Sequence, residues 1–231
     1  MTDYNIDFLI AGLVFLIFLL VHFQRYKKLN NISGRTFWFL IIAGIFDIIF
    51  DLLSSILLVK GNPAYNSWMI FFSTMLYILQ MIVVYIFFNY TQALRHCNED
   101  IRARNVKIMA VPILCMELAI VTNVFHKQFF YCNAQGQYVH GKAYLVTYIF
   151  TLICIAGVIV NCFINQEEYQ ENELRAIKEF LGVALVCVTV QMKFQSVLMT
   201  GFGLSLGITI LFWALYNPQL YIDSLTGSYS K

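Results

Sequence analysis

The stretch that decides the fold is IKEFLGVALVCVTVQMKFQSVLMTGFGLSLGITILFWALY, which runs from Ile177 to Tyr216. It is mostly apolar, and the turn-like segment MKFQS interrupts it near Lys193. A single α-helix over the roughly 39 residues from 177 to 215 would be nearly 60 Å long, about twice the hydrocarbon thickness of a bilayer. We therefore expect two membrane-spanning helices, 177–193 and 196–215, joined by a tight turn.

The rest of the chain has the composition of a membrane protein. Of its 231 residues, 60% are apolar and 12% are charged, against roughly 45–50% and 25% in soluble domains. Five further apolar runs are long enough to cross a bilayer, at about 6–24, 37–59, 67–94, 106–125 and 142–164. The sequence thus predicts an all-α membrane protein, in which residues 1–216 form a bundle of seven transmembrane helices.

The orientation of this bundle follows from its lysines and arginines, which are enriched in cytoplasmic loops. With the N-terminus outside and the C-terminus in the cytosol, eleven of the fifteen basic residues fall on the inner side. The four on the outer side are Lys60, Lys127, Lys142 and Lys193. An even number of spans would spoil this alternation, which supports counting 177–193 as a separate helix.

Several function classes find no support in the sequence. The net charge of +2 gives no basic face for nucleic acid. The six cysteines form no CxxC pair and no HExxH motif is present, so we expect no metal site and no cofactor. Only Cys132 lies on the predicted outer side, so no intramolecular disulfide is expected there.

The candidate site residues are acidic groups inside the predicted spans. Asp47 and Asp51 share one face of the second helix with Ser54 and Ser55. Counted along the helices, Asp47 and Glu117 both lie about 15 Å deep, so we expect Glu117 to approach the two aspartates. A carboxylate in a membrane points into the bundle. These groups either form a cavity for a ligand, proton or cation, or only fix helix packing.

Other polar residues could line an outward-open pocket with these acids, or could simply pack. They are Gln80 in the third span, Tyr144 and Tyr148 in the fifth, and Gln191 and Gln195 near the last outer turn. The histidines that flank the outer loop, His126 and His140, are expected to be solvated. Three glycines of the last span are expected to allow close helix packing; they are Gly201, Gly203 and Gly207.

Beyond residue 216 the chain turns polar, with a short linker at 217–222 and the segment DSLTGSYSK at 223–231. Asp223, Leu225, Thr226 and Gly227 resemble the D-x-L-T-G-[LM]-x-N-R opening of GGDEF domains, the catalytic domains of diguanylate cyclases. This chain departs from that pattern at its last positions, which hold Ser228, Ser230 and Lys231. The resemblance implies that 223–231 are the first residues of a truncated cytosolic GGDEF-like domain.

The membrane region resembles the seven-helix sensory regions that precede GGDEF domains and histidine kinases in Gram-positive bacteria. The resemblance rests on four segments: FDIIFDLLSS, VPILCMELAIVTN, FFYCNAQGQYVHGKAYLVTY and GFGLSLGITILFWALYNPQLYIDSLTG. It implies a sensory input domain in a bacterial plasma membrane that responds to an unidentified small molecule or ion. It also implies a homodimer and a cyclic di-GMP output. The catalytic GGDEF loop is not in this sequence, so the chain itself is not expected to be an enzyme.

Three other functions compete with this one. Asn217, Pro218 and Tyr221 fit the N-P-x-x-Y motif of rhodopsin-like receptors, but the motif follows the last span and no D-R-Y follows the third. A retinal protein would need a lysine in the last span, which has none. A small ion or solute channel or carrier could use the buried acids, although we see no paired repeats of the kind that carriers usually have.

Overall fold

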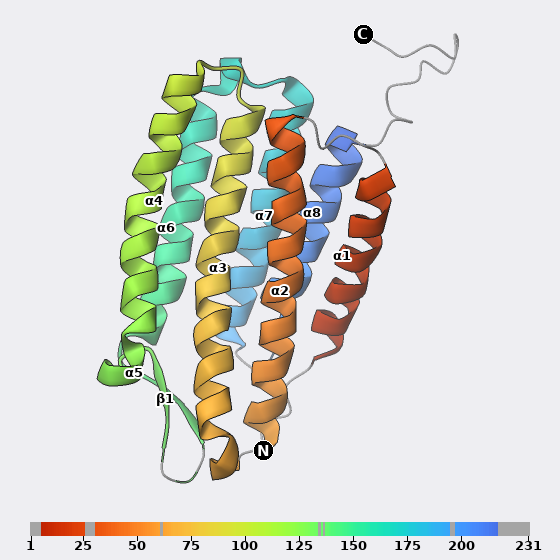
Figure 1. Ribbon diagram of the computed structural model, residues 1–231. Helices are drawn as coiled ribbons and strands as arrows, with labels where there is room; N and C mark the ends of the chain where they lie inside the picture. The colour runs from red at the N-terminus through yellow and green to blue at the C-terminus, as the bar shows by residue number, and fades with distance from the viewer. Residues whose placement is uncertain are drawn as a thin grey trace.

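In the computed structural model, the described residues are 6–25, 31–60, 62–133, 135, 137–194 and 197–216. They form an up-and-down bundle of long helices with one small β-hairpin at one end (Figure 1). The long helices are α1 (Asp7–Arg25), α2 (Ile32–Lys60), α3 (Asn66–Leu94), α4 (Glu99–Val121), α6 (Tyr144–Ile164), α7 (Glu171–Lys193) and α8 (Thr200–Tyr216). The short elements are α5 (Asn123–His126), β1 (Phe130–Cys132), β2 (Tyr138–His140) and two 3-10 turns, Pro63–Tyr65 and Gln166–Glu168.

Each of the seven apolar runs identified in the sequence is a helix in the structure. In particular, α7 ends at Lys193 and α8 begins at Thr200, so the prediction of two helices in place of one is confirmed. Helices α2, α4 and α7 begin five to seven residues earlier than predicted, and polar residues cap the last two of these. The Asn98 side chain accepts a hydrogen bond from the Asp100 backbone before α4, and Gln170 forms a capping box with Glu173 before α7.

Four of these helices are long and apolar enough to cross a membrane; the windows are Asp7–Gln24, Ile32–Val59, Pro63–Leu94 and Tyr144–Ile164. The other three differ for identifiable reasons. The first turns of α4 and α7 are charged, and α8 has only 17 residues, about 25 Å of helix. The structure is thus helical, and four of its helices have the length and composition of membrane-spanning segments.

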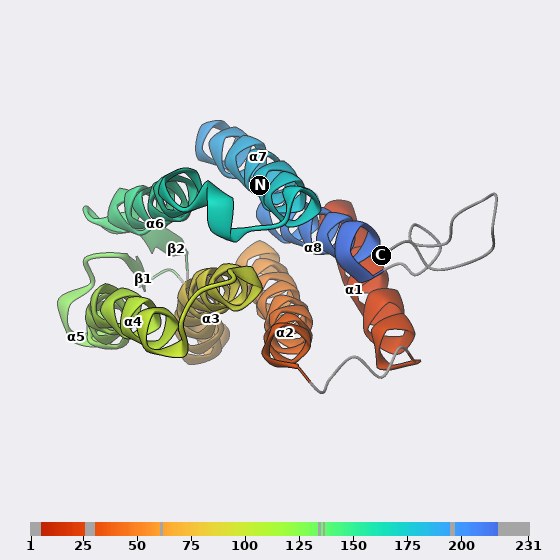
Figure 2. The same cartoon turned by 90° about the horizontal axis from the view of Figure 1, so that it is seen from above.

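The middle of the bundle, seen end-on in Figure 2, is surrounded by α2, α3, α6, α7 and α8. Helix α3 packs against α2 and α6, α7 packs against α6 and α8, and α8 also contacts α2. The other two lie outside this ring: α4 packs on α3, and α1 packs on α2 and α8. The interior of the bundle is therefore lined by α2, α3, α6, α7 and α8.

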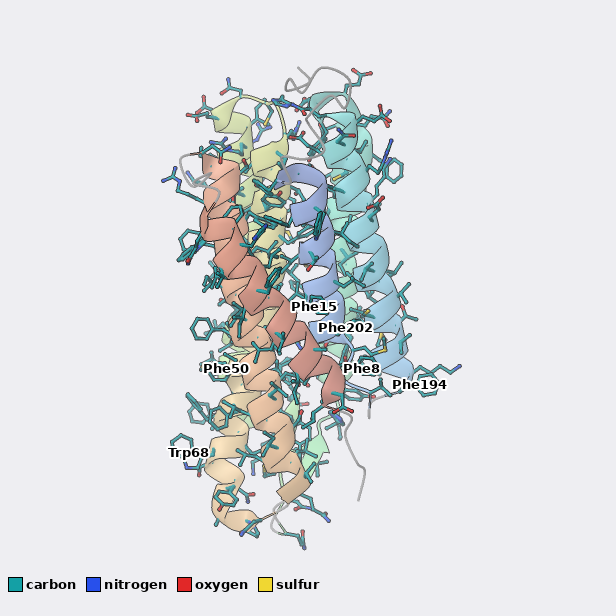
Figure 3. All side chains as sticks on the ribbon, turned by 90° about the vertical axis from the view of Figure 1, so that its right-hand side faces the viewer. Phe8, Phe15, Phe50, Trp68, Phe194 and Phe202 are labelled. Atoms are coloured by element: carbon teal, nitrogen blue, oxygen red, sulfur yellow. The ribbon has the colours of Figure 1, made fainter. Side chains whose placement is uncertain are left out.

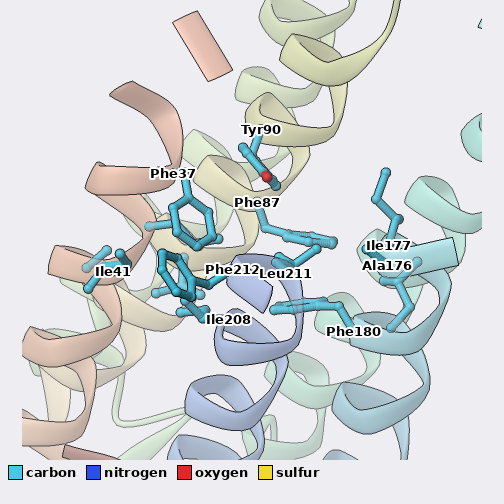
Figure 4. Packing of buried hydrophobic residues seen from close by; sticks show 14 of the residues in the cluster. Phe37, Ile41, Phe87, Tyr90, Ala176, Ile177, Phe180, Ile208, Leu211 and Phe212 are labelled. Carbon is cyan, nitrogen blue, oxygen red and sulfur yellow. The ribbon is translucent and has the colours of Figure 1, made fainter. Parts of the chain in front are cut away.

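Aromatic stacking and close glycine contacts hold the ring together. The rings of Phe87 on α3 and Phe180 on α7 stack with centroids 4.0 Å apart (Figure 4). A Cβ atom at Gly207 of α8 would lie 2.6 Å from the Phe180 ring, and one at Gly203 would lie 2.7 Å from the Cys187 Cβ atom of α7. At Gly201 it would lie 2.8 Å from Leu9 of α1. A side chain at any of these positions would require its neighbours to shift, so the three glycines lie at close helix contacts, as expected.

The outer surface of the bundle is apolar along its length. Phe15 and Trp68, labelled in Figure 3, lie on the side of the bundle, and each is more than half exposed. Phe18 is 67% exposed, and Leu118 on α4 is 66% exposed. A soluble monomer rarely exposes such a continuous apolar surface, whereas a bilayer would cover it.

The hairpin end of the bundle is built on Asn123. Its amide nitrogen donates to the carbonyl of Phe130, and its amide oxygen accepts a hydrogen bond from the backbone of Phe129, both at 2.8 Å. Strands β1 and β2 then pair antiparallel, with Tyr131 opposite Val139. Gly141 follows directly, where a Cβ atom would collide with the carbonyl of Gln128. This end is thereby fixed against α3 and α6.

Polar side chains connect the helices at the opposite end. Arg95, after α3, is 8% exposed, forms an ion pair with Glu168 and donates to Asn165 at 2.7 Å. The hydrogen bond from the Arg95 guanidinium lowers the pKa of the Glu168 carboxyl. Gln92 donates to Asn161 of α6 and accepts from Asn105 of α4. The ion pair Glu171–Arg175 forms at 3.0 Å, as the charge-rich segment before 177 leads one to expect.

Candidate functional site

Two neighbouring cavities lie inside the helical ring. The hairpin cavity, of about 80 Å³, is bounded by α2, α3, α6, α7 and strand β2. The central cavity, of about 110 Å³, lies between α2, α3, α6, α7 and the start of α8. Gln80 of α3 and Tyr148 of α6 line both cavities, so these two side chains form their common wall. Each volume is several times the roughly 10–15 Å³ that one water molecule requires.

The hairpin cavity is polar because one face of α2 turns toward it. Asp51, Ser54 and Ser55 are spaced so that they share this face, and each is less than 9% exposed. The Ser55 side chain forms a hydrogen bond with the Asp51 carboxylate. Ser73 and Tyr77 approach from α3. The α2 face that the sequence pattern marked as polar is thus a cavity wall.

Aromatic side chains form the part of the hairpin cavity nearest the surface. Tyr77 stacks on Phe130, with ring centroids 5.2 Å apart, and its hydroxyl lies 3.5 Å from that of Tyr138. The rings of His140 and Tyr144 lie 4.6 Å apart. His140 is exposed and also lines the cavity, so the cavity reaches the surface beside the hairpin.

The central cavity is apolar apart from a few groups, of which Asp47 is the most unusual. Its walls include Val83, Phe87, Ile155, Phe180, Val188 and Leu204. Asp47 is 5% exposed, and no described residue donates a hydrogen bond to its Oδ1 atom. A buried carboxylate oxygen without a donor is destabilising. Helix packing alone does not account for Asp47, because a packing role would give this oxygen a partner.

Both aspartates belong to the same site. They lie one turn apart on α2. Asp47 lines the central cavity, and Asp51 lines the neighbouring hairpin cavity. No lysine or arginine lines either cavity among the described residues. The site therefore carries two acidic groups with three tyrosines and two glutamines along its walls, and no lysine or arginine among the described residues.

Glu117 lies elsewhere, which corrects the expectation that it approaches the two aspartates. It is half-buried on α4, beside the buried stripe of Ile113, Met116 and Ile120 that packs toward α3. Helix α3 stands between α4 and α2, as Figure 2 shows. Counting residues from the helix ends gives depth in the membrane, but it does not give the order in which helices neighbour one another.

The other predicted residues fall into two groups. Gln80 lines both cavities, whereas Tyr144 is half-buried against His140, and Tyr148 one turn further along α6 takes the lining position. Gln191 lines the hairpin cavity, and its side-chain oxygen also accepts hydrogen bonds from the backbones of Met199 and Thr200. Gln191 therefore helps to hold the link between α7 and α8.

Sequence reasoning missed the contributions of the loop and of α3. His140, expected to be solvated, and Tyr138 enter the site because β1 and β2 fold back over it. A signal for this hairpin was present, since Asn133 and Gly136 separate two short runs rich in aromatic and β-branched residues. Tyr77 and Ser73 carried no such signal, because tyrosine and serine are common in membrane helices.

The donor set of the site favours hydrogen bonding and charge recognition over metal binding. No group of three His, Cys, Asp or Glu side chains capable of holding a metal ion occurs among the described residues. The carboxylates, hydroxyls and amides instead offer acceptors and aromatic faces to a small polar or cationic molecule. Such a cavity is a typical ligand site between helices of a bundle.

No protein-family model matches the chain, and a search of curated proteins finds no relative. The GGDEF-like segment, with Asp223, Leu225, Thr226 and Gly227, lies outside the described residues, as does the linker at 217–222. The functional assignment therefore depends on the cavities and on the sequence pattern.

Proposed function

We propose that this chain is the sensory input domain of a bacterial membrane signalling protein, with seven spans, its N-terminus outside and residue 216 on the cytosolic side. The observation that carries the proposal is the buried Oδ1 atom of Asp47, which has no hydrogen-bond partner among the described residues and lies in the central cavity, next to the hairpin cavity that reaches the surface. A polar cavity that is open at one end and lies between helices is suited to receiving a ligand. A bound ligand would compensate the buried carboxylate oxygen of Asp47, which favours binding.

The charge distribution supports this orientation. The helix ends near the hairpin have few basic residues, such as Lys127 and Lys142. The opposite end of the bundle is richer in them; it holds Arg35, Arg95, Arg102, Arg104, Lys107, Arg175 and Lys178. Positive residues favour the cytosolic side, so the hairpin end is the proposed outer end.

Reporter fusions test the proposed topology. A cytosol-dependent reporter fused after Lys231 is expected to be active, and one inserted between Gln135 and Gln137 is expected to be active only if it functions outside the cell. The control is the exchanged pair of reporters, which should both be silent. If the reporters show that both fusion positions lie on the same side of the membrane, the model of seven spans is wrong.

Helix α8 is the proposed output element. Thr200 and Leu204, in its first turns, line the central cavity. At its other end, the ring of Tyr216 packs edge-to-face against Phe23 of α1 and at a tilt against Phe37 of α2, and the hydroxyls of Tyr90 and Tyr216 are 3.4 Å apart. A ligand that shifts the beginning of α8 would therefore alter the packing next to the exit of the chain toward the cytosol. The resemblance at 223–227 makes a dimeric diguanylate cyclase the proposed output.

A carrier remains the second candidate because acidic groups occupy the interior. The Phe87–Phe180 stack and the polar connections around Arg95 lie between the central cavity and the far end, which favours a receptor over a path through the bundle.

An in-frame fusion of the whole chain to a diguanylate cyclase domain tests the sensory proposal. Cellular cyclic di-GMP is expected to change severalfold in Asp51→Asn relative to wild type, because the substitution alters the charge that the ligand and the helices respond to. Glu117→Gln, outside the cavities, is the matched control and should behave as wild type. Equal cyclic di-GMP in all three fusions, with solute uptake that depends on Asp51, would contradict the sensor and indicate a carrier.

A further inference from the structure

The charge of the site selects the sign of its ligand. Asp47 and Asp51 are each about 95% buried, lie one turn apart and have no lysine or arginine lining their cavities among the described residues. A buried carboxylate is most stable when a cation or hydrogen-bond donors compensate it. An anionic ligand would add repulsion, and a neutral one would leave the negative charge of the two carboxylates uncompensated. A cationic ligand supplies what the site lacks.

The surroundings of the carboxylates select an organic cation over a metal ion. Tyr77, Tyr138 and Tyr148 line the hairpin cavity around Asp51. The faces of aromatic rings attract ammonium groups, and this attraction grows when the pair is removed from water. Bare metal ions prefer several oxygen, nitrogen or sulfur ligands, and no cluster of three His, Cys, Asp or Glu groups is found in the described part of the chain.

The central cavity provides for an apolar tail. Beyond the common wall of Gln80 and Tyr148, its lining is dominated by aliphatic and aromatic groups such as Phe87, Ile155 and Phe180. Water gains few hydrogen bonds there, whereas an alkyl chain would remove apolar surface from water. Because Asp47 stands on the central side and Asp51 on the hairpin side, a cationic head at the common wall reaches both carboxylates.

We infer that the site binds a small amphipathic cation, a protonated amine whose ammonium group lies between Asp47 and Asp51 and whose alkyl chain extends toward Phe87 and Phe180. The molecule enters beside the hairpin, past Tyr138 and His140. This inference rests on the proposed sensory function and names the class of its stimulus. It differs from proton sensing, because the apolar chamber contributes to the affinity.

Binding of n-hexylammonium to the purified full-length chain in lipid nanodiscs tests the inference, with empty nanodiscs as the background. Saturable binding of hexylammonium is expected by calorimetry, and none of hexanoate or hexanol. Asp51→Asn and Asp47→Asn keep the side-chain shape and are expected to weaken binding about 10- to 100-fold, as loss of a charged hydrogen-bond partner does. Glu117→Gln removes another carboxylate outside both cavities and should leave binding unchanged.

A second variant separates the head from the tail. Ala184 lines the central cavity from α7, so Ala184→Phe is expected to fill the chamber. Binding of hexylammonium should fall at least tenfold, while binding of methylammonium stays within about twofold of wild type. If the Asp→Asn variants do not accumulate in the membrane, the different effects of Ala184→Phe on hexylammonium and methylammonium binding still test the inference.

The outcomes are distinguishable from those for the sensory proposal. No saturable binding of hexylammonium, or equal binding in wild type and Asp51→Asn, overturns the amphipathic cation as the ligand. If Ala184→Phe weakens the binding of hexylammonium and of methylammonium equally, the inference is also overturned, because the alkyl chain would then not occupy the central cavity. Hexylammonium that binds as expected but leaves cyclic di-GMP unchanged in the fusion contradicts the sensor and leaves the ligand class intact.

Discussion

Asp47→Leu is expected to stabilise the bundle and at the same time to abolish the response to ligand. The Oδ1 atom of Asp47 is buried without a hydrogen-bond donor, and its cavity is lined by apolar groups such as Val83 and Leu204. Leucine has the same branched arrangement of four side-chain heavy atoms, with methyl groups in place of the oxygens, and removes the uncompensated polar group. Replacing buried ion pairs by well-packed apolar residues is often neutral or stabilising by about 1–4 kcal/mol, and we expect a gain within that range for this acid.

The measurement is reversible unfolding in detergent micelles, followed by circular dichroism, together with the amine-binding assay. Asp47→Asn is the isosteric comparison: it should bind weakly but gain less stability, because the amide is still polar. Glu117→Leu is the control for the loss of an acid from a membrane helix, since Glu117 lies on α4 away from both cavities. It should retain binding. A leucine at 47 that lowers stability would assign Asp47 to helix packing.

The helices of this protein could be predicted because each satisfies a local rule. The apolar runs are long, Lys193 and its neighbours interrupt the last of them, and the charged segments before α4 and α7 contain their own capping residues, Asn98 and Gln170. The polar face of α2 followed equally from spacing, because Asp47, Asp51 and Ser54 are three or four residues apart and therefore share one face of a helix.

The residues of other elements that contact this face of α2 could not be predicted from spacing. Glu117 has the right depth, yet its azimuth on α4 and the position of α4 behind α3 separate it from α2. Tyr148 and Gln80 meet because α3 and α6 pack together, a contact between segments far apart in the sequence. Tyr138 reaches the cavity only through pairing of β2 with β1. Such tertiary contacts determine which polar residues form the site.

Phe180→Ala is expected to cause the largest loss of stability of any single substitution considered for this bundle. Phe180 is 5% exposed, stacks on Phe87 and packs against the backbone of α8 at Gly207. Truncating a buried phenylalanine removes its contacts with α3 and α8 together and leaves a void, at a cost of about 3–5 kcal/mol. The free energy of unfolding in micelles measures this loss. Phe39→Ala, which truncates a side chain that is 52% exposed, should change stability by less than about 0.5 kcal/mol.

The same substitution should alter ligand preference, because Phe180 is also a wall of the central cavity. Removing the ring lengthens the apolar chamber beyond Phe87, so binding should shift toward longer amines, with n-octylammonium gaining relative to n-hexylammonium. Methylammonium, held between Asp47 and Asp51 without an alkyl chain in the chamber, should be affected little. At temperatures where the variant remains folded, an unchanged ratio of octylammonium to hexylammonium affinity would mean that the alkyl chain does not reach Phe180, and that the chamber between α3 and α7 serves packing alone.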